Sequence, residues 1–472
     1  MSETDVERVP EPDEAGARSR AREAAGRAGS VALGAARTAG RRVAEAAGAG
    51  GDPDADVDHG RAALDPSADV DVLVVGGGPV GLVAAIEARL AGLTVAIAEP
   101  RGARGGVGAA SDADRPAAPA GAGALDADPM AATDTGGPPP TPPGSPPASL
   151  PAEIVSDLGV TGAGDPIDKA CGEGLMPGAL PLLGRLGVAP HGLALRGVRY
   201  SDGIRSVEHR FREGAAVGLG VRRTELHRAL AERAAGLGVT RIAAKVDALA
   251  QDSTGVTAAG IRASWLVAAD GLHSTIAREV GLARPAPRRR RRYGLRRHAR
   301  VTPWSELIEV HWTPRAEIYV TPVDDRLVGI AVLARQGVGF DEALAEAPEL
   351  VARLGDVEWA DEVMGAGPFR QRTRRRVAGR VLLVGDASGY VDAITGEGLR
   401  LGFDQARAAV KRIRSGDAVH YEADWFHVTR AFRRVTGLLA WAATVPALRR
   451  RIVPLAASRP AWFGRVVDRL AR

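Results

Sequence analysis

The segment from Asp71 to Glu99, DVLVVGGGPVGLVAAIEARLAGLTVAIAE, constrains the fold more than any other part of the chain. The apolar run Val72 to Val75 predicts a buried parallel strand, and the glycine-rich turn after it lets backbone N–H groups approach a bound phosphate. A helix is expected from Pro79 to Ala91, followed by a second apolar strand from Thr94 to Ala98. Glu99 then stands where a ribose hydroxyl pair needs an acceptor. Together these features predict a dinucleotide-binding unit.

Composition narrows the class of protein. The 472 residues are 45% hydrophobic and 25% charged, which is ordinary for a globular chain with room for two domains. The basic excess is almost entirely arginine, and the one dense basic run, Arg288 to Arg292, has no interleaved aromatic residue. We therefore expect a solvated face there and no nucleic-acid partner.

Several kinds of chemistry are not expected. Cys171 is the only cysteine, so an intrachain disulfide is impossible and a reducing, cytoplasmic location is expected. The nine histidines show no metal-ligand spacing, and no GxSxG motif is present. No signal peptide and no uninterrupted apolar run of membrane-spanning length is found.

Two further motifs follow predicted strands. In VLLVGDASGYVDAITGEGLRLG, Gly385 and Asp386 come directly after the strand Val381 to Val384, and Gly396 and Gly398 open the next helix, whose free N–H groups can face an electron-rich ring edge. In VAADGLHSTIAR, Asp270 and Gly271 follow the strand Ile261 to Ala268, and Asp270 can also cap the helix that begins near Ser274. Ligands bind beyond such strand ends in open α/β sheets.

Periodicity predicts the remaining elements. Alternating segments at 295–301, 307–312, 316–320 and 327–333 predict an antiparallel sheet that forms a candidate substrate domain. Helices are expected at 174–186, 224–236, 341–354, 399–415, 421–451 and 461–470, and further strands at 195–200, 206–211, 217–221, 241–250 and 255–257.

With these motifs in place, the chain resembles the FAD-dependent oxidoreductases of the p-hydroxybenzoate hydroxylase superfamily, which includes aromatic-ring monooxygenases, geranylgeranyl-type reductases and flavin-dependent halogenases. The resemblance implies an α/β (α+β two-domain) fold, with a Rossmann-like FAD-binding domain, an inserted antiparallel-sheet substrate domain and C-terminal helices. It rests on the glycine fingerprint with Glu99, on the Asp-Gly motif and on the Gly-Asp motif, and covers about Asp69 to Ser415 without the insertion.

The expected organisation is a disordered Ala/Arg-rich arm (1–66), FAD-binding segments (67–101, 165–190, 214–284 and 376–415), a disordered Pro/Gly/Ala-rich insertion (102–164), substrate-domain segments (191–213 and 285–375) and a C-terminal helical segment (416–472). The resemblance also implies which residues bind FAD. These are Gly76, Gly78, Pro79, Gly81, Glu99, Lys169 of DKACGEGL, Arg223 of RTELHRAL, Asp270, Gly271, Gly385, Asp386, Gly396 and Gly398.

Two reactions are compatible with these motifs. The DGLHS form of the Asp-Gly motif and the R-x-x-L helix start favour a monooxygenase that hydroxylates a hydrophobic aromatic or polyketide-like molecule with NAD(P)H and O2. The stretch after the Gly-Asp motif and DKACGEGL are closer to the geranylgeranyl reductase branch, which favours reduction of isoprenoid double bonds. A flavin- or nicotinamide-binding regulator without turnover is a third interpretation.

The substrate is expected to be a small hydrophobic molecule in a dry cavity. Candidate cavity residues are Cys171, Trp304, Trp312, Tyr319, Pro322, Tyr390 and Ile394, although aromatic residues on a sheet also commonly form core. The C-terminal stretch Thr429 to Pro454 mixes apolar residues with arginines, so a peripheral membrane contact and a helix packed on the FAD domain are both open interpretations.

Overall fold

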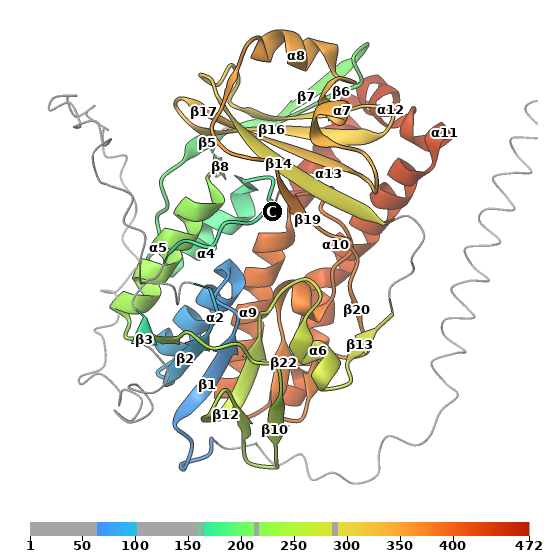
Figure 1. Cartoon of the computed structure of the whole chain (residues 1–472). Coiled ribbons are helices and arrows are strands. Elements are labelled where there is room, and N and C mark those ends of the chain that lie inside the picture. Colours follow the sequence, from blue (N-terminus) through green and yellow to red (C-terminus); the bar gives the residue numbers. More distant parts are fainter. Residues whose placement is uncertain (1–63, 102–159, 162–164, 212–216, 286–290, 472) are drawn as a thin grey trace, which may run out of the picture. The chain divides into compact units, whose positions relative to one another are not determined.

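The computed structural model describes residues 64–101, 160–161, 165–211, 217–285 and 291–471. Most of the predicted arm and insertion lies outside these residues. The first sheet is the Rossmann-like one, and its parallel strands run in the order β22, β12, β1, β2, β9 (Figure 1). The bounds of these strands are Val381–Leu383, Ile261–Ala268, Val70–Val75, Val95–Ala98 and Thr240–Ile242.

The two faces of β1 are buried in different layers, as its continuous apolar sequence requires. Val72 and Val74 join the core formed with helices α2, α5, α9 and α10, whereas Leu73 and Val75 join a second core on the opposite face. The helices on the first face are α2 (Pro79–Leu90), α5 (Arg223–Gly236), α9 (Gly398–Arg414) and α10 (Tyr421–Thr444). The second core contains α6 (Thr275–Glu279) and residues of β10 (Leu249–Gln251) and β11 (Val256–Ala258), two antiparallel strands that extend the same sheet beyond β12.

Glycines bring the first helix close to its neighbours. A Cβ on Gly81 would lie 1.9 Å from the carbonyl oxygen of Gly76, and a Cβ on Gly402 would lie 2.5 Å from a methyl group of Val80. Only glycine permits this approach of backbone to backbone. As a result, α2 packs directly on the glycine turn and against α9.

The second sheet lies across the top of the molecule in Figure 1 and has the strand order β18, β14, β17, β16, β15, β6, β7, with β19 beside β14. Its pairings are antiparallel except for β15 with β6. The bounds are Glu358–Trp359 (β18), Arg292–Arg300 (β14), Leu327–Arg335 (β17), Ala316–Asp324 (β16), Leu307–Trp312 (β15), Gly197–Ser201 (β6), Ser206–Arg210 (β7) and Met364–Ala366 (β19).

Helices cover this second sheet. The short helices α7 (Phe340–Leu344) and α8 (Pro348–Leu354) share one apolar core with β14, β16 and β17. The C-terminal helices α12 (Ile452–Ser458) and α13 (Pro460–Leu470) pack against the edge strand β7. Between them and α10 lies α11 (Pro446–Arg449), whose Arg449 forms an ion pair with the buried Glu317 of β16. The remaining elements are β13 (Ala283–Arg284), β20 (Arg372–Thr373), β21 (Val377–Ala378), η2 (Gly385–Ser388) and η3 (Ala418–His420).

Four predictions need correction. The helix expected at 174–186 is helical only in its second half, as η1 (Pro177–Ala179) and α4 (Leu180–Arg185). Its start is strand β4 (Gly174–Leu175), which pairs with β8 (Gly218–Gly220), itself paired with β5 (Leu193–Leu195). A Cβ on Gly174 would meet Ile308 at 2.8 Å, so close packing under the second sheet holds this segment extended.

The strand expected at 241–250 is two strands, because β9 joins the parallel sheet beside β2 whereas β10 begins the meander with β11. The helix expected at 341–354 is interrupted before Pro348, which begins α8 and cannot continue a helix. Finally, Val160–Thr161, assigned to the insertion by composition, form β3 and pair with β9.

Candidate cofactor and substrate cavity

A cavity of about 610 Å³ lies beyond the C-terminal ends of β1, β12 and β22 and extends beneath the second sheet. The glycine turn, the DKACGEGL loop, the Asp-Gly motif and the Gly-Asp motif all contribute lining residues. Segments separated by about 300 positions in sequence therefore meet at one site, as expected for ligand binding at the ends of parallel strands.

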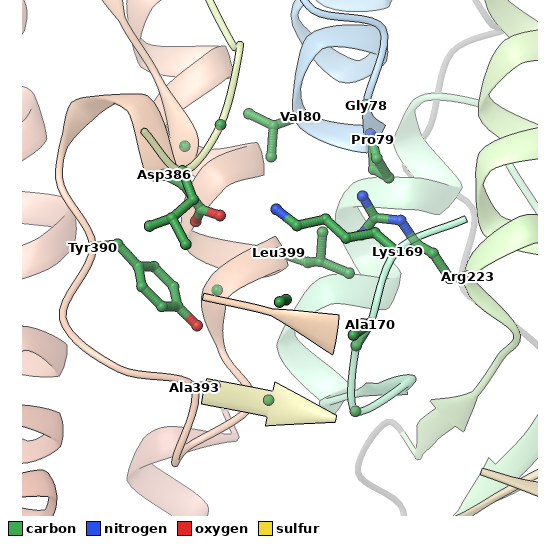
Figure 2. A pocket seen from close by; sticks show the side chains of 18 of the residues that line it. Gly78, Pro79, Val80, Lys169, Ala170, Arg223, Asp386, Tyr390, Ala393 and Leu399 are labelled. Carbon is green, nitrogen blue, oxygen red and sulfur yellow. The ribbon is translucent and has the colours of Figure 1, made fainter. Parts of the chain in front are cut away.

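The glycine turn leaves open space at one position. Gly76 has φ +104°, which a side chain would strain, and Gly81 is buried under it and does not line the cavity. In contrast, Gly78 has φ −68° and ψ 171°, and a Cβ there would meet only the Arg223 guanidinium at 3.9 Å. The start of α2, with Pro79, therefore presents free backbone N–H groups to a space that an anion can enter. Figure 2 shows Gly78 and Pro79 above Arg223.

Two buried side chains hold this turn. Glu99 accepts a hydrogen bond from the N–H of Gly77 at 2.8 Å, and its second oxygen accepts from the backbone and side chain of Arg101. His227 on α5 forms a hydrogen bond from Nε2 to the carbonyl oxygen of Gly77 at 2.9 Å, so Nε2 is the protonated nitrogen. Burial lowers the pKa of His227 to about 4, so the ring stays neutral at physiological pH.

Asp270 performs the capping role and keeps one oxygen free. Its Oδ2 accepts from the backbone N–H groups of Thr275 and Ile276 at 2.7 and 3.1 Å, at the start of α6. Its Oδ1 is buried without a hydrogen-bond partner among the described residues. Burial raises the pKa of this carboxyl group. Because a buried acceptor without a partner is costly, Oδ1 is suited to a ligand hydroxyl or N–H.

The Gly-Asp motif forms the opposite wall. Gly385 has φ +59°, and its N–H donates to Gln405 on α9 at 2.8 Å, which fixes the turn η2. Asp386 points into the cavity, and Lys169 extends towards it from the other side (Figure 2). Gly396, Gly398 and Leu399 also line the cavity at the start of α9, so the positive end of this helix faces the same space.

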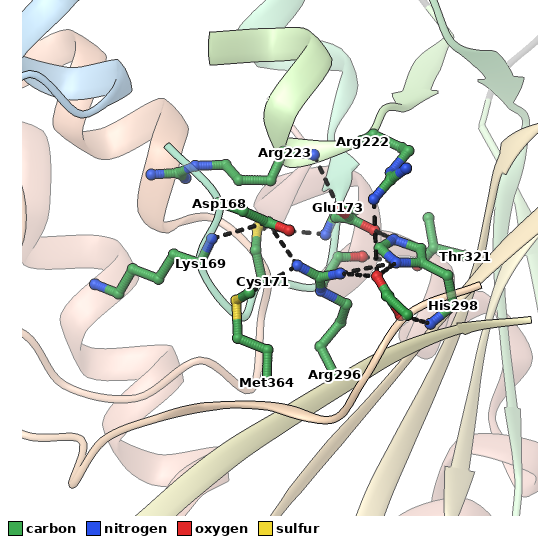
Figure 3. A network of polar contacts seen from close by, with 12 residues as sticks. Asp168, Lys169, Cys171, Glu173, Arg222, Arg223, Arg296, His298, Thr321 and Met364 are labelled. Atoms are coloured by element: carbon green, nitrogen blue, oxygen red, sulfur yellow. Dashed lines mark hydrogen bonds and ion pairs between the residues drawn. The ribbon is translucent and has the colours of Figure 1, made fainter. Parts of the chain in front are cut away.

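The DKACGEGL loop is held by a buried polar network beneath the second sheet (Figure 3). Arg296 of β14, 1% exposed, donates to Asp168 at 2.5 Å and to Asp361 at 2.8 Å. His298, two residues along β14, lies between Asp361 at 2.5 Å and Glu173 at 2.6 Å.

Glu173 has φ +56° and also accepts from the backbone N–H of Arg223 at 2.9 Å. It therefore ties the loop to the start of α5 as well as to β14. The network fixes the loop segment that carries Lys169 and Cys171 into the cavity.

The second half of the cavity is apolar. Strands β6 and β14 to β17 present no charged side chain to it among the described residues, and only Tyr200, Tyr319 and Thr321 present a polar atom. The hydroxyl of Tyr319 donates to the carbonyl of Ile394 at 2.8 Å, and that of Thr321 donates to the carbonyl of Gly172 at 2.8 Å. The remaining side-chain wall includes Val198, Leu295, Ile308, Val310, Ala331, Val332, Leu333, Phe369, Val467 and Leu470.

The candidate substrate residues divide into two groups. Cys171, Tyr319, Tyr390 and Ile394 line the cavity, whereas Trp304, Trp312 and Pro322 do not. Trp312 lies on the same face of β15 as Ile308 and Val310, which line the cavity, but it is a core residue packed on Tyr200, with ring centroids 5.9 Å apart. Strand alternation gives the face of a residue, but it does not say how far along the strand the cavity extends.

Sequence reasoning also missed residues. His227, Glu173, Arg296 and His298 were not singled out, although all four are buried and hold the loops of the site. The sequence did indicate a role for His227, because this residue lies four positions after Arg223 and therefore on the same face of α5. The network around Arg296 had no such signal, because its partners are distant in sequence.

These features fit FAD. The pyrophosphate fits the open space at Gly78, at the N-terminus of α2. Polar groups of the ribityl and flavin portion fit the free Oδ1 of Asp270 and the carboxylate of Asp386. The electron-rich edge of the flavin ring fits the N-terminus of α9. The polar half of the cavity therefore suits the dinucleotide, and the apolar half beneath the second sheet suits an apolar substrate.

Comparison with known proteins supports this assignment. Residues 205–415 match the FAD binding domain family model. A curated menaquinone reductase from Mycolicibacterium smegmatis is 28% identical over 324 residues, which is 60% of this chain and 77% of that protein.

Among solved structures, a flavin-dependent brominase variant has a TM-score of 0.61 at 16% identity, covering 85% of this chain and 94% of that chain. The anhydrotetracycline hydroxylase from Streptomyces rimosus has a TM-score of 0.56 at 20% identity, covering 85% and 75%. The chain is therefore an FAD-dependent oxidoreductase with an FAD binding domain, and its fold is similar to that of flavin-dependent halogenases and hydroxylases.

Proposed function

We propose that the protein reduces a carbon–carbon double bond in an apolar, isoprenoid-like substrate, with FAD as cofactor and NAD(P)H as electron donor. The observation that carries this proposal is the uncharged wall that β6 and β14 to β17 present to the cavity. Two of its three polar side chains, Tyr319 and Thr321, already donate their hydroxyl hydrogens to backbone carbonyls.

The apolar wall distinguishes between the two reactions. A phenolic or polyketide-like substrate carries several polar groups, each of which costs about 1–3 kcal/mol when buried without a partner. A hydrocarbon chain carries none and gains free energy from every apolar surface it buries. The 28% identical relative is a menaquinone reductase, which also favours the reductase.

Each part of the site has a role in this reaction. Reduction adds one hydride and one proton across the double bond, and bound FAD would supply the hydride that it takes from NAD(P)H. The glycine turn, Asp270 and Asp386 would hold and orient the cofactor, and the apolar wall would exclude water and place the double bond beside it. The network around Arg296 would keep the Lys169 to Cys171 segment in place.

The monooxygenase remains the second candidate. The DGLHS form of the Asp-Gly motif and the position of the cavity beneath the second sheet favour it. Both candidates require bound flavin, so they differ in how the reduced cofactor is reoxidised.

The test uses the flavin-loaded protein, reduced anaerobically with NADPH and then mixed with a polyprenyl substrate such as a menaquinone. Flavin reoxidation without O2, together with a product that still carries two additional hydrogen atoms in its prenyl chain after its quinol ring has been reoxidised in air, is the result expected for the reductase. Reoxidation that requires O2, with oxygen found in the product, would overturn the reductase and support the monooxygenase. Failure of the folded protein to bind flavin would remove both candidates.

We further propose that the C-terminal helices contact an anionic membrane surface from which such a substrate is drawn. Among the described residues, no helix is long and apolar enough to cross a bilayer. However, Leu438, Trp441, Leu455 and Trp462 on α10, α12 and α13 are exposed, and Arg450, Arg451 and Arg459 are exposed near them in sequence. Exposed tryptophans with arginines are typical of surfaces that lie in the membrane interface. Helix α13 also supplies Val467 and Leu470 to the cavity, which connects this surface to the site.

This contact is tested by co-sedimentation with phosphatidylglycerol vesicles. The double variant Trp441→Ser, Trp462→Ser is expected to lose most vesicle binding. The control Leu90→Ser, at a residue that is 47% exposed at the end of α2, is expected to retain it. Equal binding of the double variant and the wild type, or no binding of the wild type, would refute the contact.

A further inference from the structure

A second cavity, of about 790 Å³, lies along α10 and next to Arg376, outside the flavin site. Trp425, Thr429 and Arg433 recur every four positions on one side of α10, and Arg430 and Arg434 lie on the adjoining side. Those that carry the argument are Trp425, Arg430, Arg433 and Arg434.

The charge of this cavity is strongly positive. Four arginines line it against a single acid, Glu422, and that acid is already held by Arg376, to which it forms an ion pair at 2.5 Å. Among the described residues, no carboxylate pairs with the partly buried Arg433 or with the exposed Arg430 and Arg434.

Arg433 is the most informative of these residues. Its guanidinium is largely buried, and its hydrogen bond goes to the carbonyl oxygen of Gly389 at 3.4 Å. Burial, together with the like charges of Arg376, Arg372 and Arg370, lowers the pKa of Arg433 to about 10. Among the described residues this guanidinium has no carboxylate beside it, so an anionic ligand would add a counter-charge that the described residues do not supply.

Trp425 organises the arginines. The guanidinium of Arg376 lies 3.5 Å from the centre of its ring and that of Arg433 lies 5.1 Å from it. The indole N–H donates to the hydroxyl of Ser388 at 2.8 Å, so the ring itself is fixed. In addition, the Nε of Arg376 is buried without a partner among the described residues. Arg376 and Arg433 are thus held in place before any ligand arrives.

We propose that this cavity is a second ligand site, which binds the phosphate group of a phosphate ester. Guanidinium groups present several N–H donors in a planar fork that matches phosphate oxygens, and two or three converging on one cavity favour a phosphate over a single carboxylate. The phosphate belongs either to the nicotinamide donor or to a lipid headgroup. Both share the same recognition chemistry.

The site is joined to the flavin cavity through one loop. Ser388 and Gly389, which contact Trp425 and Arg433, come two and three residues after Asp386, and Tyr390 lines the flavin cavity. A ligand bound in this second cavity would therefore stabilise the turn that carries Asp386.

The test measures binding of inorganic pyrophosphate to the flavin-loaded protein by titration calorimetry, with sodium chloride at matched ionic strength as the comparison. The wild type is expected to show saturable binding. Arg433→Gln is expected to weaken it by roughly tenfold to a hundredfold, the value of one charge-assisted hydrogen bond lost. Arg414→Gln, at an exposed arginine at the end of α9, is the matched control and is expected to bind as the wild type does.

Two further arms identify the source of the phosphate. If it belongs to the donor, pyrophosphate competes with NADPH in flavin reduction and Arg433→Gln raises the KM for NADPH without lowering kcat. If it belongs to a lipid, phosphatidic acid vesicles compete with pyrophosphate instead. The proposal is overturned if pyrophosphate binding is indistinguishable from the chloride effect, or if Arg433→Gln, with an unchanged circular dichroism spectrum and flavin content, binds pyrophosphate as tightly as the wild type.

Discussion

Replacing Glu397 by Gln is expected to stabilise the protein at neutral and alkaline pH. Glu397 directly precedes α9 and is 1% exposed, and its Oε1 has no hydrogen-bond partner among the described residues. Burial raises the pKa of this carboxyl group from its ordinary value of 4.5 to about 7, although the ion pair with Arg400 at 2.6 Å opposes the rise. The folded protein therefore favours the protonated form.

The sign and size of the effect follow from proton linkage. Between pH 4.5 and about pH 7 the folded state binds more protons at Glu397 than the unfolded state does, so the free energy of unfolding falls as the pH rises through this window. At about 1.4 kcal/mol per pH unit, the ionised carboxylate costs the fold roughly 3 kcal/mol above the window and nothing below it. Gln cannot ionise, it retains a side-chain oxygen for Arg400, and it avoids this cost.

The assay is urea unfolding of the wild type and Glu397→Gln below pH 4.5 and above pH 7. The variant should exceed the wild type by about 3 kcal/mol at the higher pH and match it at the lower. Glu349→Gln, at an exposed position in the first turn of α8, is the control and should show no such pH-dependent difference. Identical pH dependence of the wild type and Glu397→Gln would refute the reasoning.

Three other changes have defined outcomes. Gly81→Ala should lower the free energy of unfolding by about 1–3 kcal/mol or more, because its Cβ would overlap the carbonyl of Gly76, and urea unfolding that leaves stability unchanged would contradict the packing. His227→Leu leaves the carbonyl of Gly77 without its donor and should weaken FAD binding about tenfold, as measured by fluorescence titration. The FAD affinity of the wild type should not change with pH near neutrality, because the pKa of His227 is about 4. Arg296→Met leaves two carboxylates without their buried cation and should cost about 3–5 kcal/mol in urea unfolding, whereas a loss below 1 kcal/mol would show that the network does not hold the loop.

The local sequence pattern was sufficient to predict those helices and strands whose conformation depends little on contacts with distant residues. The strand at Val72 to Val75, the helix after it and the strand at 307–312 lie within one or two residues of the observed bounds, because apolar periodicity and glycine position decide them locally. The segment at Gly174 behaves differently, since contact with Ile308 on a distant strand overrides its helical pattern.

Sequence motifs were sufficient to identify residues that meet in one half of the cavity, and that these residues bind FAD stays a prediction. Twelve of the thirteen residues proposed for FAD line the cavity, all except Gly81, and most of them stand in motifs that follow a predicted strand. The network that positions DKACGEGL joins residues 125 to 128 positions apart, Glu173 to His298 and Asp168 to Arg296, and no local pattern records such pairs. The residues of the apolar wall could not be predicted either, because they depend on which face of each strand is turned towards the cavity.

Binding of FAD by Gly78→Val tests the central claim most directly. The backbone at Gly78 has angles that any residue adopts, and a Cβ there meets nothing closer than Arg223 at 3.9 Å, so the variant should fold. Its side chain fills the space assigned to the pyrophosphate. Equilibrium dialysis with FAD should give one FAD per wild-type chain and none for a Gly78→Val protein with an unchanged circular dichroism spectrum and unfolding midpoint. Stoichiometric FAD binding by that variant would contradict the assignment of the cavity.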